Sequence, residues 1–189
     1  QHWAHEEKAL ENTYPYGMPC VETKEQLQRL EEQLAEHNIL LLFRPHPVQD
    51  LSVFHKEELP HIRIADDVFL ASMECTLYEL LAQTDALITD YSSVYFDYLL
   101  TDRPIALTIA DREEYFTRFT LAFPDYKEAV KGFYIETFSQ LSSFLAEIAE
   151  GVDSAREERM PAKEKYHTKD AGNSAKAIVD LLEKEYRLK

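Results

Sequence analysis

The chain has 189 residues, and its 35 acidic and 20 basic side chains give a net charge of −15 at neutral pH. This charge argues against binding nucleic acid or an anionic membrane over the whole surface, but it permits a local cationic pocket for a small anion. Hydrophobic residues make up 45% of the chain, so a folded domain with its own core is expected. No apolar run is long enough to span a bilayer.

Several kinds of cofactor and metal site are excluded by what the sequence lacks. Its four glycines are widely separated, so it contains neither a glycine-rich dinucleotide loop nor a Walker A loop. It has no Asp-x-Asp pair of the kind that marks metal-dependent nucleotide-sugar transferases. Cys20 and Cys75 show no metal-ligand spacing and are expected to be reduced thiols. His2 and His5 are interpreted as part of a terminal segment or helix face rather than as metal ligands.

Alternating helices and strands are predicted along most of the chain. Thr23 is expected to cap a helix with Gln26 three residues on, and Leu27, Leu30 and Leu34 form its apolar stripe. Strands are predicted at 39–43, 61–65, 86–88 and 105–109, and further helices open at Thr76, at 91–93, near Leu141 and at 172–174. This order predicts one α/β domain, a Rossmann-like parallel sheet with helices on both faces.

The first candidate loop follows the strand at 39–43. Ligands of parallel α/β sheets bind beyond the carboxyl ends of the strands, where this loop lies. Arg44 and His46, in Arg-Pro-His-Pro, offer a planar fork of donors and a titratable imidazole, both suited to phosphate oxygens. The alternative interpretation is a rigid surface turn whose arginine pairs with carboxylates.

The second candidate loop, Thr-Asp-Tyr-Ser-Ser at 89–93, follows the strand at 86–88 and leads into a helix. Backbone N–H groups at a helix start, together with the hydroxyls of Ser92 and Ser93, are suited to an anion. The alternative is that Ser92 or Ser93 only caps the helix. Two such loops at neighbouring strand ends together favour phosphate binding.

A family resemblance rests on these loops and their surroundings. Residues 87–97, Leu-Ile-Thr-Asp-Tyr-Ser-Ser-Val-Tyr-Phe-Asp, followed by Arg-Pro-Ile at 103–105, resemble the signature of the CDP-glycerol glycerophosphotransferases of teichoic acid synthesis. The Arg-Pro-His element at 44–46 is similar to one found upstream in that family. Further similarities, at 114–115, 132–134 and 166–170, extend the resemblance over about residues 41–182.

The resemblance implies an architecture as well as a chemistry. The family is expected to have a two-domain GT-B glycosyltransferase fold that needs no metal or other cofactor. Residues 1–189 would form a single donor-binding domain, the C-terminal half of that fold, excerpted from a longer protein, with residues 1–20 as an inter-domain or N-terminal segment. The N-terminal domain of the same full-length protein would supply a catalytic histidine. Because no histidine here precedes a glycine, this chain alone is expected to lack the acceptor half and that base.

The implied reaction transfers glycerol phosphate from CDP-glycerol, or a related CDP-polyol, to a glycerol-phosphate polymer or lipid-linked acceptor. A hydroxyl of the acceptor attacks the β-phosphorus of the donor, and CMP leaves. The full-length enzyme is expected to be cytoplasmic and peripheral at the inner face of the bacterial cell membrane, with no nucleic acid partner.

By the resemblance, Arg44 and His46 are the catalytic residues of this half. They would stabilise the transferring or leaving phosphate, on which charge develops during the reaction. Ser92 and Ser93 would bind the diphosphate of the donor through N–H and O–H groups.

Three further residues receive roles from the same resemblance. Lys131 stands where the family commonly has arginine before Gly-Phe-Tyr, so it would bind phosphate without a bidentate fork. Asp90 is expected to support the loop, because a carboxylate facing phosphates would repel them. Asp97, about two helical turns further on, would meet the ribose or cytosine.

Two other classes of protein stay open on the sequence. One is a different GT-B donor domain that takes a UDP- or CMP-linked sugar. The other is a non-catalytic α/β module such as a receiver, for which Asp66, Asp67 and Asp90 supply an acidic cluster. A receiver also needs a lysine after a late strand, whereas Ala110 and Asp111 follow the strand at 105–109. The basic side chains between 156 and 169 are interpreted as a solvated helix because glutamates are interleaved with them.

Overall fold

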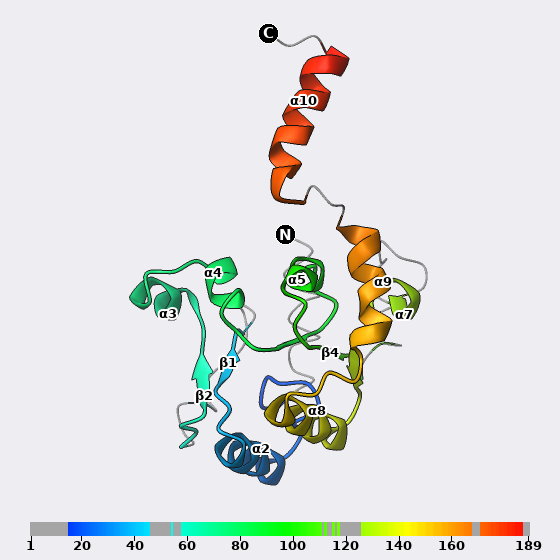
Figure 1. The fold of residues 1–189 in the computed structure, drawn as a ribbon. Helices are drawn as coiled ribbons and strands as arrows, with labels where there is room; N and C mark the ends of the chain where they lie inside the picture. The colour runs from blue at the N-terminus through cyan, green and yellow to red at the C-terminus, as the bar shows by residue number, and fades with distance from the viewer. Residues whose placement is uncertain are drawn as a thin grey trace.

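The computed structural model describes residues 15–45, 54, 58–110, 112, 115, 117, 126–167 and 171–186. Two short parallel sheets lie among helices (Figure 1). One sheet pairs β1 (Leu41–Phe43) with β2 (Ile62–Ile64), and the other has the order β3 (Leu87–Thr89), β4 (Ile105–Thr108), β5 (Phe133–Ile135). The predicted α/β, Rossmann-like class with parallel strands is confirmed.

The helices fall mostly where the sequence predicts them. They are α2 (Lys24–Glu36), α3 (Asp67–Ser72), α4 (Leu77–Leu81), α5 (Val94–Tyr98), α7 (Tyr126–Ala129), α8 (Phe138–Glu150), α9 (Arg156–Tyr166) and α10 (Ser174–Tyr186), with short 3-10 turns η1 (Leu99–Thr101) and η2 (Ala171–Asn173). The elements α3, α7 and β5 were not predicted, because segments this short show little periodicity.

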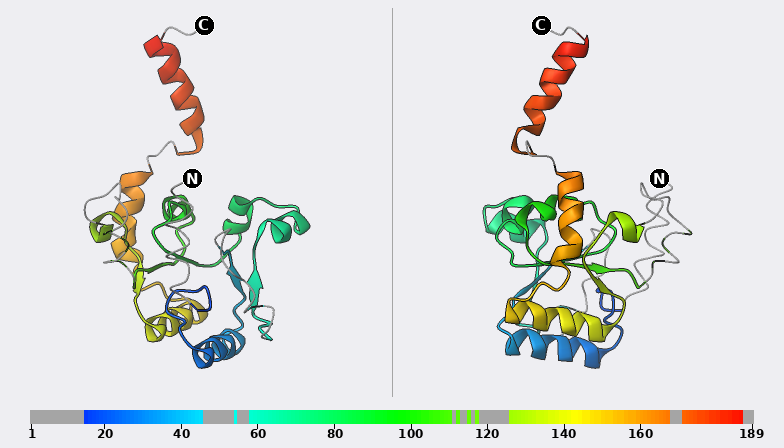
Figure 2. Two further views of the ribbon diagram at one scale, coloured as in Figure 1. Left: turned by 180° about the vertical axis from the view of Figure 1, so that it is seen from behind. Right: turned by 45° about the vertical axis from the view of Figure 1, so that its right-hand side comes forward.

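Helix α2 forms for the reason that its sequence suggests. The Thr23 hydroxyl accepts a hydrogen bond from the Gln26 backbone N–H, and the Gln26 side chain accepts one from the Thr23 N–H, which completes a capping box. Its predicted stripe of Leu27, Leu30 and Leu34 is fully buried. Helix α8 lies beside α2 in both views of Figure 2, so the two cover one side of the strands together.

Strand β4 separates two hydrophobic clusters. The Ala106 side chain packs with the leucine stripe of α2 and with α8. Ile105 and Leu107 pack on the opposite side, with Tyr95 of α5 and Ala162 of α9. Successive side chains of a strand point to opposite faces, so the three-stranded sheet is covered on both. Helices on both faces are therefore present, as predicted.

The two sheets share the α2–α8 cluster. Leu41 and Phe43 of β1 pack against it, and so do Ile88 of β3 and Phe133 of β5. In one sheet β1 pairs with β2, and in the other β3 pairs with β4 and β4 with β5. Parallel α/β sheets bind their ligands beyond the carboxyl ends of the strands, which is where the loops after β1 and β3 lie.

Helix α9 is packed against the domain rather than fully solvated. The Arg159 side chain is 2% exposed and donates to both carboxylate oxygens of Asp153, at 3.1 and 2.6 Å. Arg156 bonds the Asp102 carboxylate at 2.6 Å, which ties α9 to the turn after η1. Two of the basic side chains in this region therefore have structural partners.

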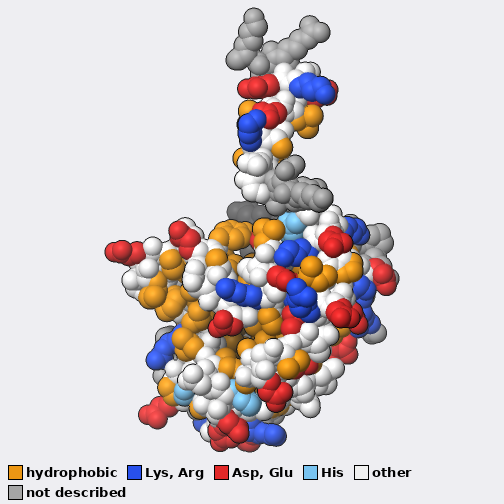
Figure 3. All heavy atoms as spheres, viewed as in Figure 1, with side chains coloured by type: hydrophobic (Ala, Val, Ile, Leu, Met, Phe, Trp, Pro, Cys, Tyr) orange, Lys and Arg blue, Asp and Glu red, His pale blue; other side chains and the backbone are white. Residues whose placement is uncertain are grey.

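Helix α10 projects away from the rest of the described residues (Figure 1). It contains no buried residue, and Ile178, Val179 and Leu182 expose an apolar face to solvent. Figure 3 shows hydrophobic and charged side chains mingled along this helix. Among the described helices, none has the length and apolar character needed to cross a bilayer.

The expected N-terminal segment falls only partly within the described residues. Residues 1–14 lie outside them. Met18 and Cys20 are buried in the α2–α8 cluster, and the Cys20 thiol lies 4.0 Å from the carbonyl oxygen of Ile135. The end of this segment is thus part of the core.

Candidate functional site

The loop after β3 is shaped by its own polar side chains. The Asp90 carboxylate accepts a hydrogen bond from the Ser92 backbone N–H at 3.0 Å. The Ser92 hydroxyl accepts one from the Val94 N–H at 3.4 Å, whereas Ser93, at the N-cap position of α5, makes no side-chain cap bond. Both serines are exposed. Local capping thus engages Ser92 and leaves the Ser93 hydroxyl outside that role.

Aromatic side chains brace this loop from the segment at 115–126. The Tyr126 hydroxyl donates to the Asp90 carbonyl oxygen at 3.0 Å. The Tyr91 ring stacks on Tyr115, with ring centroids 3.9 Å apart, and meets the Tyr126 ring edge-on at 5.3 Å. Burial, followed by the charge of Asp90, raises the pKa of Tyr126, so its hydroxyl stays protonated and donates at neutral pH.

Lys131 is joined to the same loop through Tyr95. The Tyr95 hydroxyl donates to the Lys131 carbonyl oxygen and accepts from the Lys131 backbone N–H, both at 2.9 Å. The Lys131 ammonium lies 3.7 Å from a carboxylate oxygen of Glu128, which is itself exposed. Gly132 follows in close contact with β4, where an added Cβ would lie 2.7 Å from the Ile105 carbonyl oxygen.

Arg44 stands at the carboxyl end of β1, on the other sheet. Its guanidinium donates to the Ala65 carbonyl oxygen at 2.8 Å and to the Asp67 carboxylate at 2.7 Å. Ala65 lies in the connection between β2 and α3 and Asp67 is the first residue of α3, so the alternative role of pairing with a carboxylate is realised in this structure. His46 lies outside the described residues.

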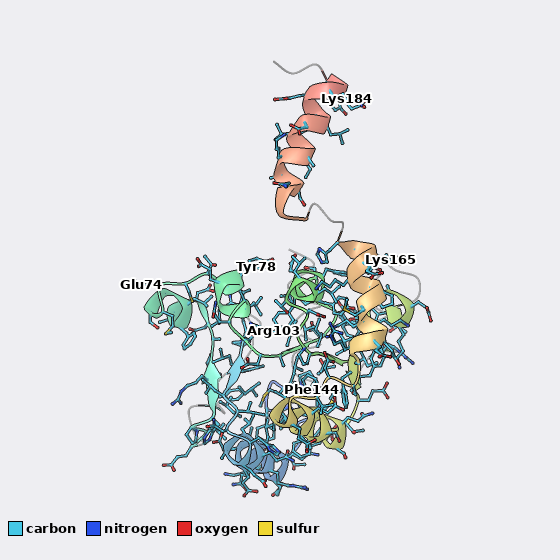
Figure 4. All side chains as sticks on the ribbon, viewed as in Figure 1. Glu74, Tyr78, Arg103, Phe144, Lys165 and Lys184 are labelled. Atoms are coloured by element: carbon cyan, nitrogen blue, oxygen red, sulfur yellow. The ribbon has the colours of Figure 1, made fainter. Side chains whose placement is uncertain are left out.

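Asp97 lies on the exposed side of α5. Its carboxylate accepts a hydrogen bond from the Tyr78 hydroxyl at 3.1 Å. Tyr78 lies on α4 (Figure 4). This hydrogen bond, with the charge of Asp97, raises the pKa of Tyr78. A phenol and a carboxylate are thus held together at the same edge of the molecule as the loop.

The segment at 166–167 packs on α5. The carbonyl oxygen of Phe96 can only accept, so His167 donates its Nε2 proton to it, at 2.6 Å. The Tyr166 ring meets the Phe96 ring edge-on, with centroids 4.8 Å apart. These contacts hold the end of α9 beside the helix that carries the loop.

The structure therefore brings Asp90, Ser92 and Ser93 into one loop and connects Lys131 to it. The sequence reasoning missed the bracing tyrosines, Tyr95 and Tyr126. The sequence predicts a helix here with Val94, Phe96, Tyr98 and Leu99 as its apolar residues; Tyr98 and Leu99 are indeed fully buried, but the third fully buried residue is Tyr95. Their i, i+3, i+4 spacing is the signal that could have found Tyr95.

Two other kinds of site were sought in the described part of the chain. No three His, Cys, Asp or Glu side chains come together there as a ligand set for a metal ion. An open cavity of about 520 Å³ lies beside β2, lined by residues from Phe54 to Ile64. None of the described candidate residues lines this cavity, so the loop after β3 is kept as the candidate site.

Fold and site together define a parallel α/β domain with a serine-bearing loop beyond the carboxyl end of β3, an edge strand of the three-stranded sheet. Comparison with known families is decisive at this point. The model of the family described as CDP-Glycerol:Poly(glycerophosphate) glycerophosphotransferase matches residues 15–184. The chain belongs to this family, as the resemblance predicted.

Its curated relatives act in teichoic acid synthesis. The chain is 28% identical over 153 residues to the teichoic acid ribitol-phosphate polymerase TarK of Staphylococcus aureus, covering 80% of this chain and 28% of that protein. It is 26% identical to a teichoic acid ribitol-phosphate primase of Bacillus spizizenii, over 82% of this chain and 37% of the relative. It is 23% identical to a teichoic acid glycerol-phosphate transferase of S. aureus, over 95% and 43%. The chain thus spans less than half the length of these relatives.

Proposed function

We propose that this chain is the donor-binding domain of an enzyme that transfers glycerol phosphate from CDP-glycerol to a teichoic acid or related polymer. The observation that carries the proposal is the loop at 90–93, in which the exposed Ser92 is joined through Tyr95 to Lys131. Family membership and the transferase names of the relatives support it. The diphosphate of the donor would lie against this loop.

The charge distribution fits a small anionic ligand rather than an anionic polymer over the whole surface. With a net charge of −15, the protein attracts phosphate only where cations and oriented donors are concentrated. Ser92 and Ser93 supply hydroxyl donors, and Lys131 supplies a positive charge. Fixed donors of this kind stabilise the charge that develops on phosphoryl oxygens during transfer.

The proposed reaction breaks the bond between the β-phosphorus of the donor and the oxygen that bridges its two phosphates. A new bond forms between that phosphorus and a hydroxyl oxygen of the acceptor, and CMP leaves with the bridging oxygen. The proton of the acceptor hydroxyl passes to a base, the histidine that the resemblance places in the N-terminal domain. Arg44 and His46 would stabilise the transferring or leaving phosphate.

Arg44 keeps donors for this role although it is engaged. A guanidinium has five N–H donors, and two serve Ala65 and Asp67. The Arg44 and Asp67 side chains are 38% and 90% exposed, so their ion pair is weak and a phosphate can compete for the arginine. Asp97, held by Tyr78, would meet the ribose or cytosine of the donor.

The architecture of the whole protein is part of the proposal. The chain would be the C-terminal half of a GT-B fold, a single donor-binding domain that works with the N-terminal domain of the full-length protein. The acceptor would be a glycerol-phosphate polymer or a lipid-linked precursor. The enzyme would act in the cytoplasm at the inner face of the cell membrane.

A ribitol-linked donor is the second candidate. Relatives named as ribitol-phosphate polymerase and primase match the chain at least as well as one named for glycerol phosphate. The serine loop and Lys131 would serve either donor, because both share a cytidine diphosphate group. The polyol therefore has to be distinguished by titration.

Calorimetric titration with CDP-glycerol, CDP-ribitol, CMP and UDP tests the proposal. Ser93→Ala should weaken binding of the CDP-polyol about fivefold, because it removes one hydrogen bond to a charged phosphate. His46→Ala should weaken it as well. Ser143→Ala is the matched control, since this exposed serine of α8 bonds only to its own helix at the Ser139 carbonyl among the described contacts.

Cytidine-selective binding that falls in both site variants, but not in the control, supports the proposal. CDP is titrated as well, and tighter binding of UDP than of CDP would point to a nucleotide-sugar enzyme instead. If neither the 189-residue chain nor the full-length protein binds any cytidine nucleotide, the proposed function is refuted.

A further inference from the structure

A single buried side chain connects the two parts of the proposed phosphate site. The Tyr95 backbone N–H donates to the Ser92 carbonyl oxygen at 3.3 Å. Its hydroxyl bonds both the N–H and the carbonyl of Lys131, 36 positions further along the chain. Tyr95 thus bonds to the serine loop through its backbone and to the lysine through its side chain.

The environment of Tyr95 makes these bonds effective. The residue is 1% exposed, and burial raises the pKa of its hydroxyl, which therefore stays neutral at physiological pH. A neutral hydroxyl can donate one hydrogen bond and accept another at the same time, as this geometry requires. Phenylalanine would fill the same space but leave both backbone groups of Lys131 without this partner.

The backbone around Lys131 is held by contacts with β4 as well as by Tyr95. Residue 131 lies between the end of α7 and the start of β5, outside regular secondary structure. Gly132, its neighbour, contacts the β4 backbone so closely that no Cβ fits without movement. One side of residue 131 is therefore fixed by β4 and the other by the Tyr95 hydroxyl.

We propose that Tyr95 is a positioning residue that holds Lys131 in place beside the Ser92–Ser93 loop and so raises the affinity of the site for a diphosphate. The proposal rests on the proposed function, because the ligand is the diphosphate of that donor. Tyr95 itself does not touch the ligand and acts through the backbone of Lys131. No part of this role was visible in the sequence.

Tyr98 provides a matched comparison on the same helix. It is 2% exposed, and its hydroxyl also makes two hydrogen bonds, to the Thr84 carbonyl oxygen at 2.9 Å and to the Thr84 hydroxyl at 3.0 Å. Thr84 follows α4 and is not a candidate site residue. A purely structural role for buried tyrosine hydroxyls therefore predicts similar behaviour for Tyr95→Phe and Tyr98→Phe.

The test measures CDP affinity by calorimetry in the 189-residue chain, or in the full-length protein if only that form binds. Tyr95→Phe should weaken CDP binding about fivefold, because Lys131 loses the hydrogen bonds that hold it in place and a single hydrogen bond contributes a free energy of this size. Tyr98→Phe should leave CDP binding unchanged. In a Lys131→Met background, Tyr95→Phe should have no further effect, because the group it positions is gone.

Three results would overturn the role of Tyr95 while leaving the proposed function intact. They are equal losses of CDP affinity in the two Phe variants, a loss in Tyr95→Phe that persists in the Lys131→Met background, and an unchanged affinity in Lys131→Met itself. Absence of CDP binding to the unsubstituted protein refutes the proposed function and this role with it. Faster hydrogen exchange of the Lys131 amide in Tyr95→Phe, but not in Tyr98→Phe, reports the lost contact independently of any ligand.

Discussion

At the residue level, Arg44 shows how an internal partner can compete with a ligand. Its guanidinium is held by the Ala65 carbonyl and by Asp67, and the carboxylate is far more exposed than the arginine. A phosphate that approaches Arg44 must share it with this carboxylate. In the proposed site, Asp67 therefore competes with phosphate for the Arg44 guanidinium.

Removing the charge of the competing Asp67 carboxylate should strengthen binding of the donor. Asp67→Asn should tighten CDP-polyol binding about twofold at low salt, since exposed ion pairs are worth little and salt screens them. Glu74→Gln is the matched control, because it removes an equal charge from the exposed turn between α3 and α4. Equal tightening in both variants would show that net charge, rather than competition for Arg44, is responsible. Calorimetry at two salt concentrations gives the measurement.

The placement of candidate residues was predictable from the sequence only where it depends on near neighbours. Polar residues after an apolar run predicted the loop at 90–93, and the structure places Asp90, Ser92 and Ser93 there. The contact of Tyr95 with Lys131 joins positions 36 apart and exists only because β5 pairs with β4. Such a contact leaves no local signal.

At the level of elements, the connection from α7 to β5 depends on a glycine. A Cβ at Gly132 would lie 2.7 Å from the Ile105 carbonyl oxygen and 3.3 Å from the Leu107 Cδ1 atom. The first atom is backbone in the middle of the sheet and cannot move aside easily. The close approach of β5 to β4 and the position of Lys131 both follow from this missing side chain.

Gly132→Ala should therefore lower the free energy of unfolding by about 1–3 kcal/mol, the usual effect of overpacking a core. Gly172→Ala is the control, because nothing lies within 4 Å of a Cβ built there. Urea unfolding followed by circular dichroism measures both. Similar stability of the two variants would show that the sheet accommodates the added methyl group.

Elements with strong local signals were predicted, and those fixed by tertiary contacts were not. The capping box and leucine stripe of α2 lie within one segment and specify the helix. In α9, by contrast, interleaved glutamates suggested a solvated helix, yet Arg159 is buried against Asp153. Its charge is acceptable in the core only because that carboxylate lies beside it, which the pattern of α9 alone could not reveal.

At the level of the whole molecule, the described residues divide into a packed body and the projecting helix α10. The bond from His167 to Phe96 holds the end of α9 against the packed body. Beyond it, α10 exposes Ile178, Val179 and Leu182 and buries nothing. Burial of apolar area supplies most of the stability of a domain, so α10 contributes little to that of the body.

A chain that ends after His167 should keep its thermal midpoint within about 2 °C of the 189-residue chain. Phe96→Ala in the shortened chain is a useful comparison, since it removes the ring that packs against Tyr166 and should lower the midpoint. Scanning calorimetry measures all three proteins. A drop of more than about 5 °C on shortening would show that α10 packs on the body in solution.

The division into two sheets has a mechanical consequence for the site. In the described part of the chain, no backbone ladder joins β1 to β3, so Arg44 and the serine loop belong to separate hydrogen-bonded units. Side-chain packing in the shared core holds the two sheets together, and such contacts are non-directional and individually weak. In the proposed site, the distance between Arg44 and the serine loop is therefore the part of the geometry that changes most easily. A diphosphate that bridges both loops would draw the sheets together, and part of its binding energy would be stored as that closure.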